Sequence, residues 1–405
     1  MKGSEARGCL AQAQGIQLNF YRVIIFWLLL CFLLGGGIMA LLTPGMEYVD
    51  GLFIAMSALT GTGFSSVESR AISMGGFVTI YILMYLGGTC TLLLPPIIYR
   101  RMAYGKIRPQ LQEFLLREAT PDILLSNDSM HGQAARVRDR PLARTLVNAI
   151  NHSELLYRGL GMSLIAVALH NFFWLFIGTF IMYGIAQLYA EPQELVDRDF
   201  SKLWTAAFLT ASSYFNCGIT LTSDSMVQYS RSYGVYLWSS ILILAGNNVA
   251  PMFLRGLVRL MYMSADVLPF DKVGLRFALD NPRLMTTHMF SSRQTRALLL
   301  ILASIYLVEF VFFLGADLNR EEMQVYGDKA TLVGIGYYQT ISTRGAGLQM
   351  IDLRRCNQGM LVVYVFTMYI SAAPFASQMH ASAQHMGEDG IATGTHRDSA
   401  AAWRS

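Results

Sequence analysis

The sequence predicts an all-α membrane protein built from repeated units, each with an outer helix, a re-entrant segment and an inner helix. Composition is the first reason: 53% of the 405 residues are hydrophobic and only 14% are charged, whereas soluble domains carry about 25% charged residues. The apolar residues also gather into long uncharged runs, and short semi-polar segments recur between those runs. These features argue against a soluble multidomain enzyme and against a disordered protein.

Long windows without Asp, Glu, Lys or Arg mark the expected spans, because a membrane-spanning helix needs about 20 mostly apolar residues. We expect one span in each of the windows 23–46, 71–99, 159–190, 232–254, 297–316 (interrupted by Glu309) and 357–387. The segments 51–66, 203–223 and 330–343 are shorter and rich in Gly, Ser and Thr. They are typical of re-entrant segments, which enter the membrane and return on the same side.

Basic and acidic residues separate along the chain. Ten Lys and Arg residues lie from Arg100 to Arg158, and seven lie from Arg255 to Arg296. Acidic residues precede the semi-polar segments instead, as Glu47 and Asp50 precede the first. Loops rich in Lys and Arg stay on the cytoplasmic side of a membrane. We therefore expect the N-terminus and both basic linkers to be cytoplasmic, and the semi-polar segments to face outward.

The order of outer span, acidic loop, semi-polar segment, inner span and basic linker recurs along the chain. The semi-polar segments align as AMSALTGTGFSSVE (55–68), TASSYFNCGITLTSDSM (210–226) and YYQTISTRGAGLQMIDL (337–353). Such a repeat predicts units that pack around a shared axis. The predicted divisions are a cytoplasmic N-terminus at 1–19, units at 20–100, 158–262 and 296–380, cytoplasmic linkers at 101–157 and 263–295, and a polar, disordered tail at 381–405.

Each semi-polar segment has the composition of a pore loop. Backbone carbonyls on a returning strand can replace the water shell of a cation. Glycine suits such a strand because it reaches backbone angles that are closed to other residues. The preceding half-helix also points its negative C-terminal end toward the axis, which favours a cation. Turn or packing glycines, which are common in membrane helices, are the alternative interpretation.

These segments resemble the pore loops of the Trk/Ktr/HKT superfamily of potassium and sodium transporters, and its fungal Trk and plant HKT branch most of all. GNNVAPMFLRGLVRL (246–260) and YVFTMYISAAPFAS (364–377) resemble the family's second and third inner helices. The resemblance implies a pseudo-symmetric pore with an ion filter. The implied filter residues are Gly63, Gly218 and Gly347, together with the adjoining carbonyls of Thr62, Cys217 and Ala346.

The resemblance also implies four units in one chain. Three of the four are present in this sequence. The residues after the third unit, HASAQHMGEDGIATGTHRDSAAAWRS, contain no fourth pore loop. A complete filter needs a full ring of carbonyl groups around the ion. We therefore keep an alternative: the chain is a truncated, non-conducting paralogue or an accessory subunit that assembles with full-length transporters.

Other polar residues in the apolar segments have two interpretations each. Arg344, in the third pore loop, either pairs with an acid of a neighbouring unit and fixes the loop, which we favour, or forms an electrostatic barrier to cations. Proline interrupts helices, so the polar residues near prolines mark either a kink satisfied by neighbouring helices or a constriction that gates the pore. These candidate pore-lining or gating residues are Asn247, Asn248, Pro251, Ser371 and Pro374.

The expected function is transport of monovalent cations, potassium with some sodium, and not catalysis. The sequence contains no nucleophile elbow, P-loop, zinc signature or dinucleotide fingerprint, so we expect no cofactor and no metal beyond the transported K⁺ or Na⁺. By resemblance, Gly rather than Ser at position 63 favours potassium. The expected partners are membrane lipid and a second copy or a full-length homologue. Nucleic acid is not expected, because the basic linkers lack interleaved aromatic residues. The expected location is the plasma membrane.

Overall fold

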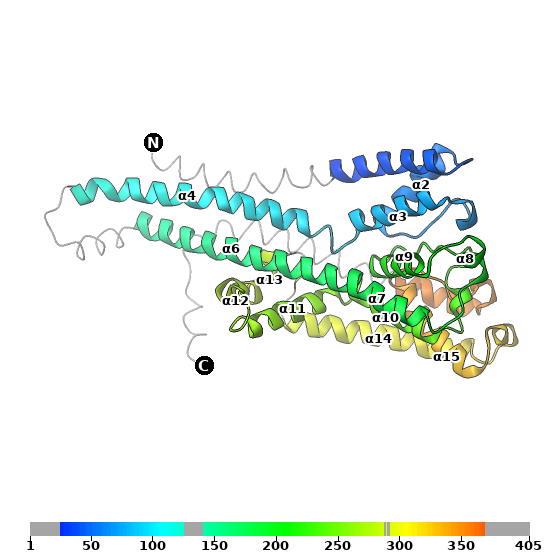
Figure 1. Cartoon of the computed structure of the whole chain (residues 1–405). Helices are drawn as coiled ribbons and strands as arrows, with labels where there is room; N and C mark the ends of the chain where they lie inside the picture. The colour runs from blue at the N-terminus through cyan, green and yellow to red at the C-terminus, as the bar shows by residue number, and fades with distance from the viewer. Residues whose placement is uncertain (1–24, 125–140, 287–288, 290–291, 369–405) are drawn as a thin grey trace.

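The computed structural model describes residues 25–124, 141–286, 289 and 292–368, and every regular element among them is a helix (Figure 1). The all-α class is thereby confirmed. The α-helices in the described part of the chain are Ile25–Leu42, α2 (Tyr48–Thr60), α3 (Met74–Gly87), α4 (Leu94–Leu124), α6 (Pro141–Phe172), α7 (Gly178–Ala186), α8 (Gln193–Asp197), α9 (Lys202–Tyr214), α10 (Tyr233–Gly246), α11 (Ala250–Ser264), α12 (Lys272–Asp280), α13 (Pro282–Met285), α14 (Ser292–Ala316), α15 (Lys329–Thr343) and Gln358–Met368.

Three of these helices, α2, α9 and α15, coincide with the predicted semi-polar segments. They have 13, 13 and 15 residues, so each is about 20 Å long, well short of a hydrocarbon core of about 30 Å. Side-chain caps fix where two of them begin: Ser201 accepts a hydrogen bond from the main chain of Trp204, and Asp328 accepts one from Thr331. The helices therefore have the length expected of half-spanning segments.

Within the described residues, three helical stretches are long and apolar enough to cross a membrane: Ile25–Leu42, Ile150–Ala186 and Thr295–Ala316. The second runs through α6, a π-helical turn (Phe173–Ile177) and α7. A fourth span is reached if α10 and α11, which meet at a bend of 78°, count as one. The inner helices thus depart from the continuous spans predicted for windows 71–99 and 232–254, because α3 ends at Gly87 and α10 ends at Gly246.

The outward faces of the long helices are apolar. Phe26 is 68% exposed, Leu300 is 68% exposed and Leu307 is 62% exposed. Such continuous apolar surface is unfavourable in water but is compatible with lipid, since the backbone polar groups of a helix are satisfied internally. This surface is the one expected of an integral membrane protein.

The short helices and the long basic helices occupy opposite ends of the molecule. Figure 1 shows α8, α9 and α15 gathered at one end, while α4 and α6 run side by side toward the other. Much of the predicted linker 101–157 is therefore helical, because α4 continues to Leu124 and α6 begins at Pro141. Amphipathic α12 packs on α6 there, where Arg158 donates two hydrogen bonds of 2.5 and 2.6 Å to Asp271.

Two apolar cores correspond to these two ends. The larger core surrounds the short helices, and its aromatic contacts include the edge-to-face pair of Phe77 and Phe208, whose ring centroids are 5.5 Å apart. The smaller core lies among α4, α6, α11 and α12 and includes Leu160, Val258 and Leu275. The larger core includes Cys217 and Ile219 of the second predicted filter segment and Ala346 and Leu348 of the third, so buried packing sets the positions of these two segments. In the first segment Thr62 and Phe64 are exposed.

Candidate functional site

Each predicted filter glycine follows the C-terminal end of one short helix. Thr60 ends α2, Tyr214 ends α9 and Thr343 ends α15, and the glycines come three or four residues later. Their φ angles are all positive: 75° at Gly63, 85° at Gly218 and 67° at Gly347. Residues with side chains rarely adopt this left-handed region. Glycine is therefore required by the backbone itself at the same place in all three segments.

The three glycine segments contact one another in chain order. A Cβ atom built on Gly63 would overlap the carbonyl oxygen of Cys217, and one built on Gly218 would overlap the carbonyl oxygen of Ala346. A Cβ on Gly347 would meet no described atom within 4 Å. The first segment thus abuts the second and the second abuts the third, while the far side of the third is open within the described part of the chain.

A buried serine on each short helix holds the backbone of the segment that follows. Its main-chain carbonyl accepts a hydrogen bond from an N–H group at the glycine or at the residue before it. The bonds are Thr62 N to Ser57 O at 3.0 Å, Cys217 N to Ser212 O at 2.9 Å and Gly347 N to Ser342 O at 2.8 Å. Each returning segment is therefore tied by its backbone to the short helix that precedes it.

In the second and third segments the same serines also use their hydroxyl groups. Ser212 Oγ donates to the carbonyl of Ile219 at 2.6 Å, and Ser342 Oγ donates to the carbonyl of Leu348 at 2.7 Å. In both cases the acceptor is the residue directly after the glycine. The sequence prediction missed these serines, although a serine five or six residues before each glycine was the signal that could have revealed them.

Backbone geometry before the glycine is also shared by the first two segments. Gly61 has a φ of 66° and Asn216 has a φ of 56°, and each lies two residues before its glycine. Asparagine is among the few residues with a side chain that tolerate this region. The Asn216 amide also donates to the carbonyls of Tyr214 at 3.2 Å and Ile243 at 3.4 Å. These bonds fasten the end of α9 to the inner helix α10.

The inner helices pack directly on the ends of the short helices through glycine. A Cβ on Gly87 of α3 would overlap the carbonyl oxygen of Leu59, and a Cβ on Gly246 of α10 would overlap that of Tyr214. Both carbonyls belong to the residue four positions before the filter glycine. The first and second units therefore share a packing relationship that the sequence prediction did not include.

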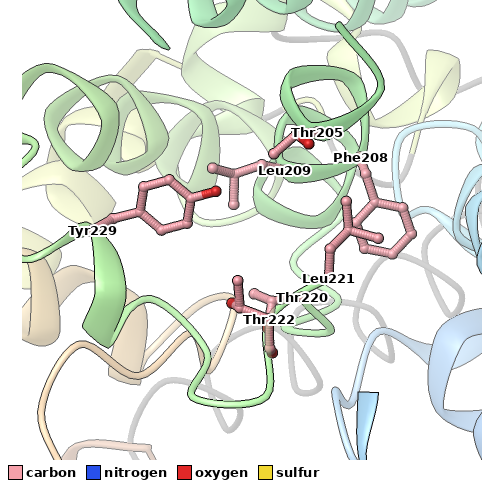
Figure 2. A pocket seen from close by; sticks show the side chains of 7 residues that line it. All are labelled: Thr205, Phe208, Leu209, Thr220, Leu221, Thr222 and Tyr229. Carbon is pink, nitrogen blue, oxygen red and sulfur yellow. The ribbon is translucent and has the colours of Figure 1, made fainter. Parts of the chain in front are cut away.

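The Cys217 side chain is completely buried, and its thiol is free. A small cavity lies between α9 and the returning segment, and Figure 2 shows the side chains around it. Its lining residues are Thr205, Phe208, Leu209, Thr220, Leu221, Thr222 and Tyr229. The cavity is thus bordered by α9 on one side and by the returning segment on the other.

Arg344 is 5% exposed at the end of α15. Its Nη1 donates to the carbonyl of Thr367 at 2.9 Å, and its guanidinium carbon lies 5.5 Å from the centroid of the Tyr306 ring. Glu309 is fully buried one helical turn after Tyr306, near enough for its charge to act on Arg344. Within the described residues Arg344 makes no ion pair with a neighbouring unit, and the nearby acid comes from the outer helix of its own unit.

The second inner helix breaks at the residues predicted to interrupt it. Helix α10 ends at Gly246, and α11 begins at Ala250 with Pro251 in its first turn. Asn248 is 3% exposed and donates to the Tyr306 hydroxyl at 3.0 Å and to the Arg344 carbonyl at 3.2 Å. Residues of the third unit therefore accept the hydrogen bonds of Asn248 at this kink, and Asn247 is the adjoining residue in the chain. Ser371 and Pro374 lie outside the described residues.

Side-chain metal ligands do not gather at this site. Among the described residues there is no group of three or more His, Cys, Asp or Glu side chains that could hold a metal ion. Oxygen atoms of the main chain, held by buried serines and approached by glycines, are instead the groups that the three segments bring together.

The fold is that of an integral membrane protein with re-entrant segments. Its half-spanning helices are each followed by a returning segment that carries a glycine, and they lie inside a helix bundle with an apolar outer surface. Residues 140–382, more than half of the chain, match the family model TrkH, described as cation transport protein. The chain therefore belongs to the TrkH family of cation transport proteins. This confirms the superfamily resemblance seen in the sequence, and a family of transport proteins agrees with the expectation that the chain is not an enzyme.

Several curated relatives are fungal. Potassium transport protein 2 of Schizosaccharomyces pombe is 29% identical over 228 residues, which cover 54% of this chain and 25% of that protein. Potassium transporter TRK1 of Candida albicans is 33% identical over 182 residues, which cover 45% of this chain and 17% of that protein. The low-affinity potassium transport protein of Saccharomyces cerevisiae is 30% identical over 177 residues, covering 44% and 20% respectively. The chain thus spans a quarter or less of these relatives.

Among solved structures, the potassium transporter TrkH from Vibrio parahaemolyticus aligns with 86% of this chain and 55% of its own, at 15% sequence identity and a TM-score of 0.42.

Proposed function

We propose that the chain forms a pathway for monovalent cations, potassium with some sodium, through a single layer of backbone carbonyls. The observation that carries this proposal is the shared geometry at Gly63, Gly218 and Gly347, where positive φ angles follow three half-spanning helices. Carbonyl dipoles replace the hydration shell of an alkali cation, and the C-terminal ends of the short helices add negative potential. The carbonyls of Thr62, Cys217 and Ala346 share this lining.

Potassium is the favoured ion because the fungal relatives are named as potassium transporters and because glycine stands at position 63. Where α10 gives way to α11, Asn248 ties the kink to Tyr306 and Arg344, and Asn247 and Pro251 lie in the same break. Arg344 acts as a structural anchor for the third segment, held by Thr367 and Tyr306. Ser371 and Pro374, which lie outside the described residues, are proposed as gating residues on the family resemblance alone.

The proposed location is the plasma membrane, with the short helices toward the outside and the basic linkers in the cytoplasm. The supporting observations are the excess of Lys and Arg from Arg100 to Arg158 and the opposite placement of the short helices in Figure 1. The proposed partners are membrane lipid and either a second copy of the chain or a full-length homologue.

Complementation tests this proposal. The chain is expressed in cells that lack potassium uptake, and growth at low potassium and Rb⁺ influx are measured for the wild type, Gly218→Arg and Gly256→Ala. Gly256 is a matched control because a Cβ there meets no atom within 4 Å. Growth should be rescued by the wild type and the control and lost in Gly218→Arg. Absence of flux from a correctly inserted wild type at every potassium concentration contradicts transport by this chain.

The second candidate function is that of a non-conducting paralogue or accessory subunit that assembles with full-length transporters. The observation that favours it is the open side of the third segment, where a Cβ on Gly347 would meet no atom of the described residues within 4 Å. Co-purification of the tagged chain with a full-length family member, without cation flux from the chain alone, is the result expected for this alternative. Flux from the purified chain alone in lipid vesicles excludes it.

A further inference from the structure

A buried carboxylate lies beyond the glycine segments, in a part of the chain that the proposed pathway does not use. Glu194 belongs to α8, and its side chain is 7% exposed. Carboxylates are rarely buried unless charged or hydrogen-bonding groups compensate them. The groups around Glu194 therefore indicate what its burial achieves.

The first set of partners comes from the returning segment of the second unit. Glu194 Oε2 accepts hydrogen bonds from Ser223 Oγ at 2.8 Å, from Ser223 N at 3.1 Å and from Gln228 Nε2 at 3.3 Å. Ser223 is five residues beyond Gly218. Glu194 thus fixes the outer end of the segment whose inner end carries the second filter glycine.

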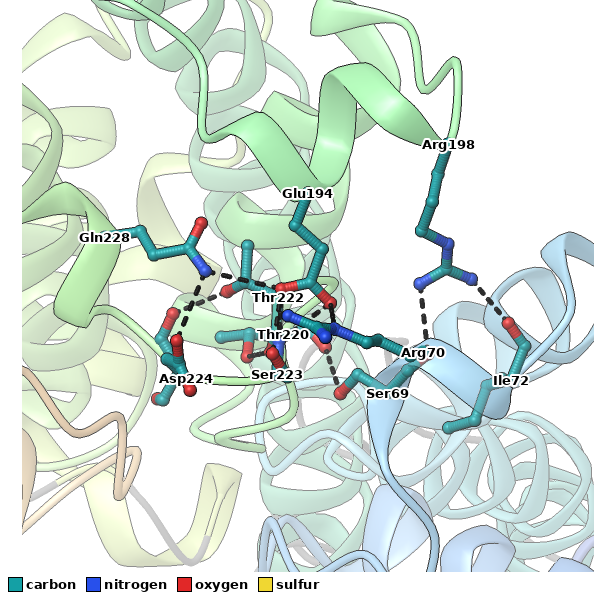
Figure 3. A network of polar contacts seen from close by, with 11 residues as sticks. Ser69, Arg70, Ile72, Glu194, Arg198, Thr220, Thr222, Ser223, Asp224 and Gln228 are labelled. Atoms are coloured by element: carbon teal, nitrogen blue, oxygen red, sulfur yellow. Dashed lines mark hydrogen bonds and ion pairs between the residues drawn. The ribbon is translucent and has the colours of Figure 1, made fainter.

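The second set of partners comes from the first unit. Arg70 Nε donates to Glu194 Oε1 at 3.2 Å, and the neighbouring Ser69 Oγ donates to the carbonyl of Thr220 at 3.1 Å. Figure 3 shows these contacts converging from both units on the returning segment. Arg70 is seven residues beyond Gly63. The contact therefore joins the outer ends of the first and second glycine segments.

A second arginine, Arg198, follows the C-terminal end of α8 and adds further hydrogen bonds between the first and second units. Arg198 donates from Nη1 to the carbonyl of Ser69 at 3.0 Å and from Nη2 to the carbonyl of Ile72 at 2.6 Å (Figure 3). Its guanidinium carbon also lies 4.7 Å from the ring centroid of Phe200. Charge-assisted hydrogen bonds to main-chain carbonyls are among the stronger ones, so the backbone of the first unit is held at two points.

The contact between the second and third units uses main-chain atoms on both sides. Between the second and third units, Met226 N donates to the carbonyl of Gln349 at 2.8 Å, and Gln349 N donates to Ser225 Oγ at 3.0 Å. A main-chain bond therefore joins those two units directly. The contacts described above between the outer ends of the first and second units depend on side chains instead, with Glu194 at their centre.

We infer that Ser69, Arg70, Glu194, Arg198 and Ser223 form an interunit clamp that sets the spacing between the first and second glycine segments. Glu194 and Arg198 are then positioning residues for cation selectivity, because the number and placement of carbonyl oxygens decide which alkali ion is favoured. This inference rests on the proposed function. It assigns to α8, a short helix outside the glycine segments, control over potassium against sodium.

The test compares Rb⁺ and Na⁺ influx, normalised to inserted protein, in the wild type, Glu194→Gln, Glu194→Asp and Asp197→Asn. Asp197 is a matched control because it is exposed on the same helix and loses the same charge. Glu194→Gln should lower the Rb⁺/Na⁺ ratio by about tenfold, the order that a net hydrogen bond to a charged group contributes. Glu194→Asp should restore part of the ratio, and Asp197→Asn should match the wild type.

The inference is overturned if Glu194→Gln has the same Rb⁺/Na⁺ influx ratio as the wild type. It is also overturned if Glu194→Gln loses both fluxes equally and less protein is inserted, because that result is a purely structural effect. Cross-linking separates this failure from failure of the proposed function. Ser69→Cys and Thr220→Cys, whose parent residues are in contact, should cross-link in membranes, and the yield should fall about threefold or more when Glu194→Gln is added. An unchanged yield refutes the clamp even in a chain that conducts nothing.

Discussion

Gly218 and the carbonyl oxygen of Ala346 approach so closely that a single methyl group on Gly218 would overlap that oxygen. The same relationship holds between Gly63 and the carbonyl of Cys217. These contacts order the three glycine segments as consecutive neighbours. The pattern also distinguishes Gly347, which has a left-handed backbone but no described neighbour in the corresponding direction.

Alanine substitution should therefore affect the three glycines unequally. Gly63→Ala and Gly218→Ala add a steric overlap to the cost of a left-handed residue, which alone is about 1–2 kcal/mol. We expect both to lose Rb⁺ influx by 100-fold or more, in order-of-magnitude terms, while Gly347→Ala keeps about a tenth of it. Equal losses at all three positions would indicate that another segment or chain fills the open side of Gly347.

The packing glycine of the second inner helix should govern stability. Gly246→Ala places a methyl group into the carbonyl of Tyr214, so we expect a loss of about 1–3 kcal/mol. Gly184→Ala is the control in α7, where a Cβ meets nothing within 4 Å. It should leave stability unchanged or raise it by about 0.5–1 kcal/mol. Melting temperatures in detergent measure both, and a Gly246→Ala protein as stable as the wild type would contradict the packing.

Arg344 and Glu309 should be energetically coupled. Both are buried, and leaving one buried charge uncompensated costs about 3–5 kcal/mol. We expect Arg344→Gln and Glu309→Gln each to destabilise the protein strongly, and the double variant to be more stable than the sum of the single effects predicts. Additive single and double effects in thermal unfolding would show that Arg344 is held by Thr367 and Tyr306 alone.

The clamp should survive acidification of the outer side. Burial raises the pKa of Glu194, but hydrogen bonds from Ser223 and the ion pair with Arg70 outweigh it and hold the pKa below its usual value. A lowered folded-state pKa gives stabilisation that is present above the unfolded pKa and lost as pH falls through the folded one. The charged groups nearby are Arg70 and Arg198, with Asp224 beyond Gln228.

The melting-temperature difference between the wild type and Glu194→Gln should accordingly stay constant from about pH 8 to about pH 5.5 and close only below about pH 4. The exposed variant Asp197→Asn serves as the control and should track the wild type throughout. A difference that disappears between about pH 7 and about pH 6 would contradict a lowered pKa for Glu194.

Local sequence features anticipated much of the site. The predicted segments 203–223 and 330–343 begin within a residue of α9 and α15, because length and polarity set a half-spanning helix apart from a span. All three predicted glycines have left-handed backbones. Contacts over long distances were not predictable in the same way. The Arg70–Glu194 pair joins residues 124 positions apart, and nothing in the local pattern of either residue names the other.

The sequence by itself determined the membrane class, the short helices and the positions where only glycine is allowed, because hydrophobicity, helix length and backbone sterics act within a few residues. Tertiary packing decided the rest. It determined which carbonyl each glycine approaches, that Arg344 lies near an acid of its own unit, and that a five-residue helix fastens the first unit to the second. These depend on how distant segments meet in a close-packed interior, where a single methyl group changes the fit.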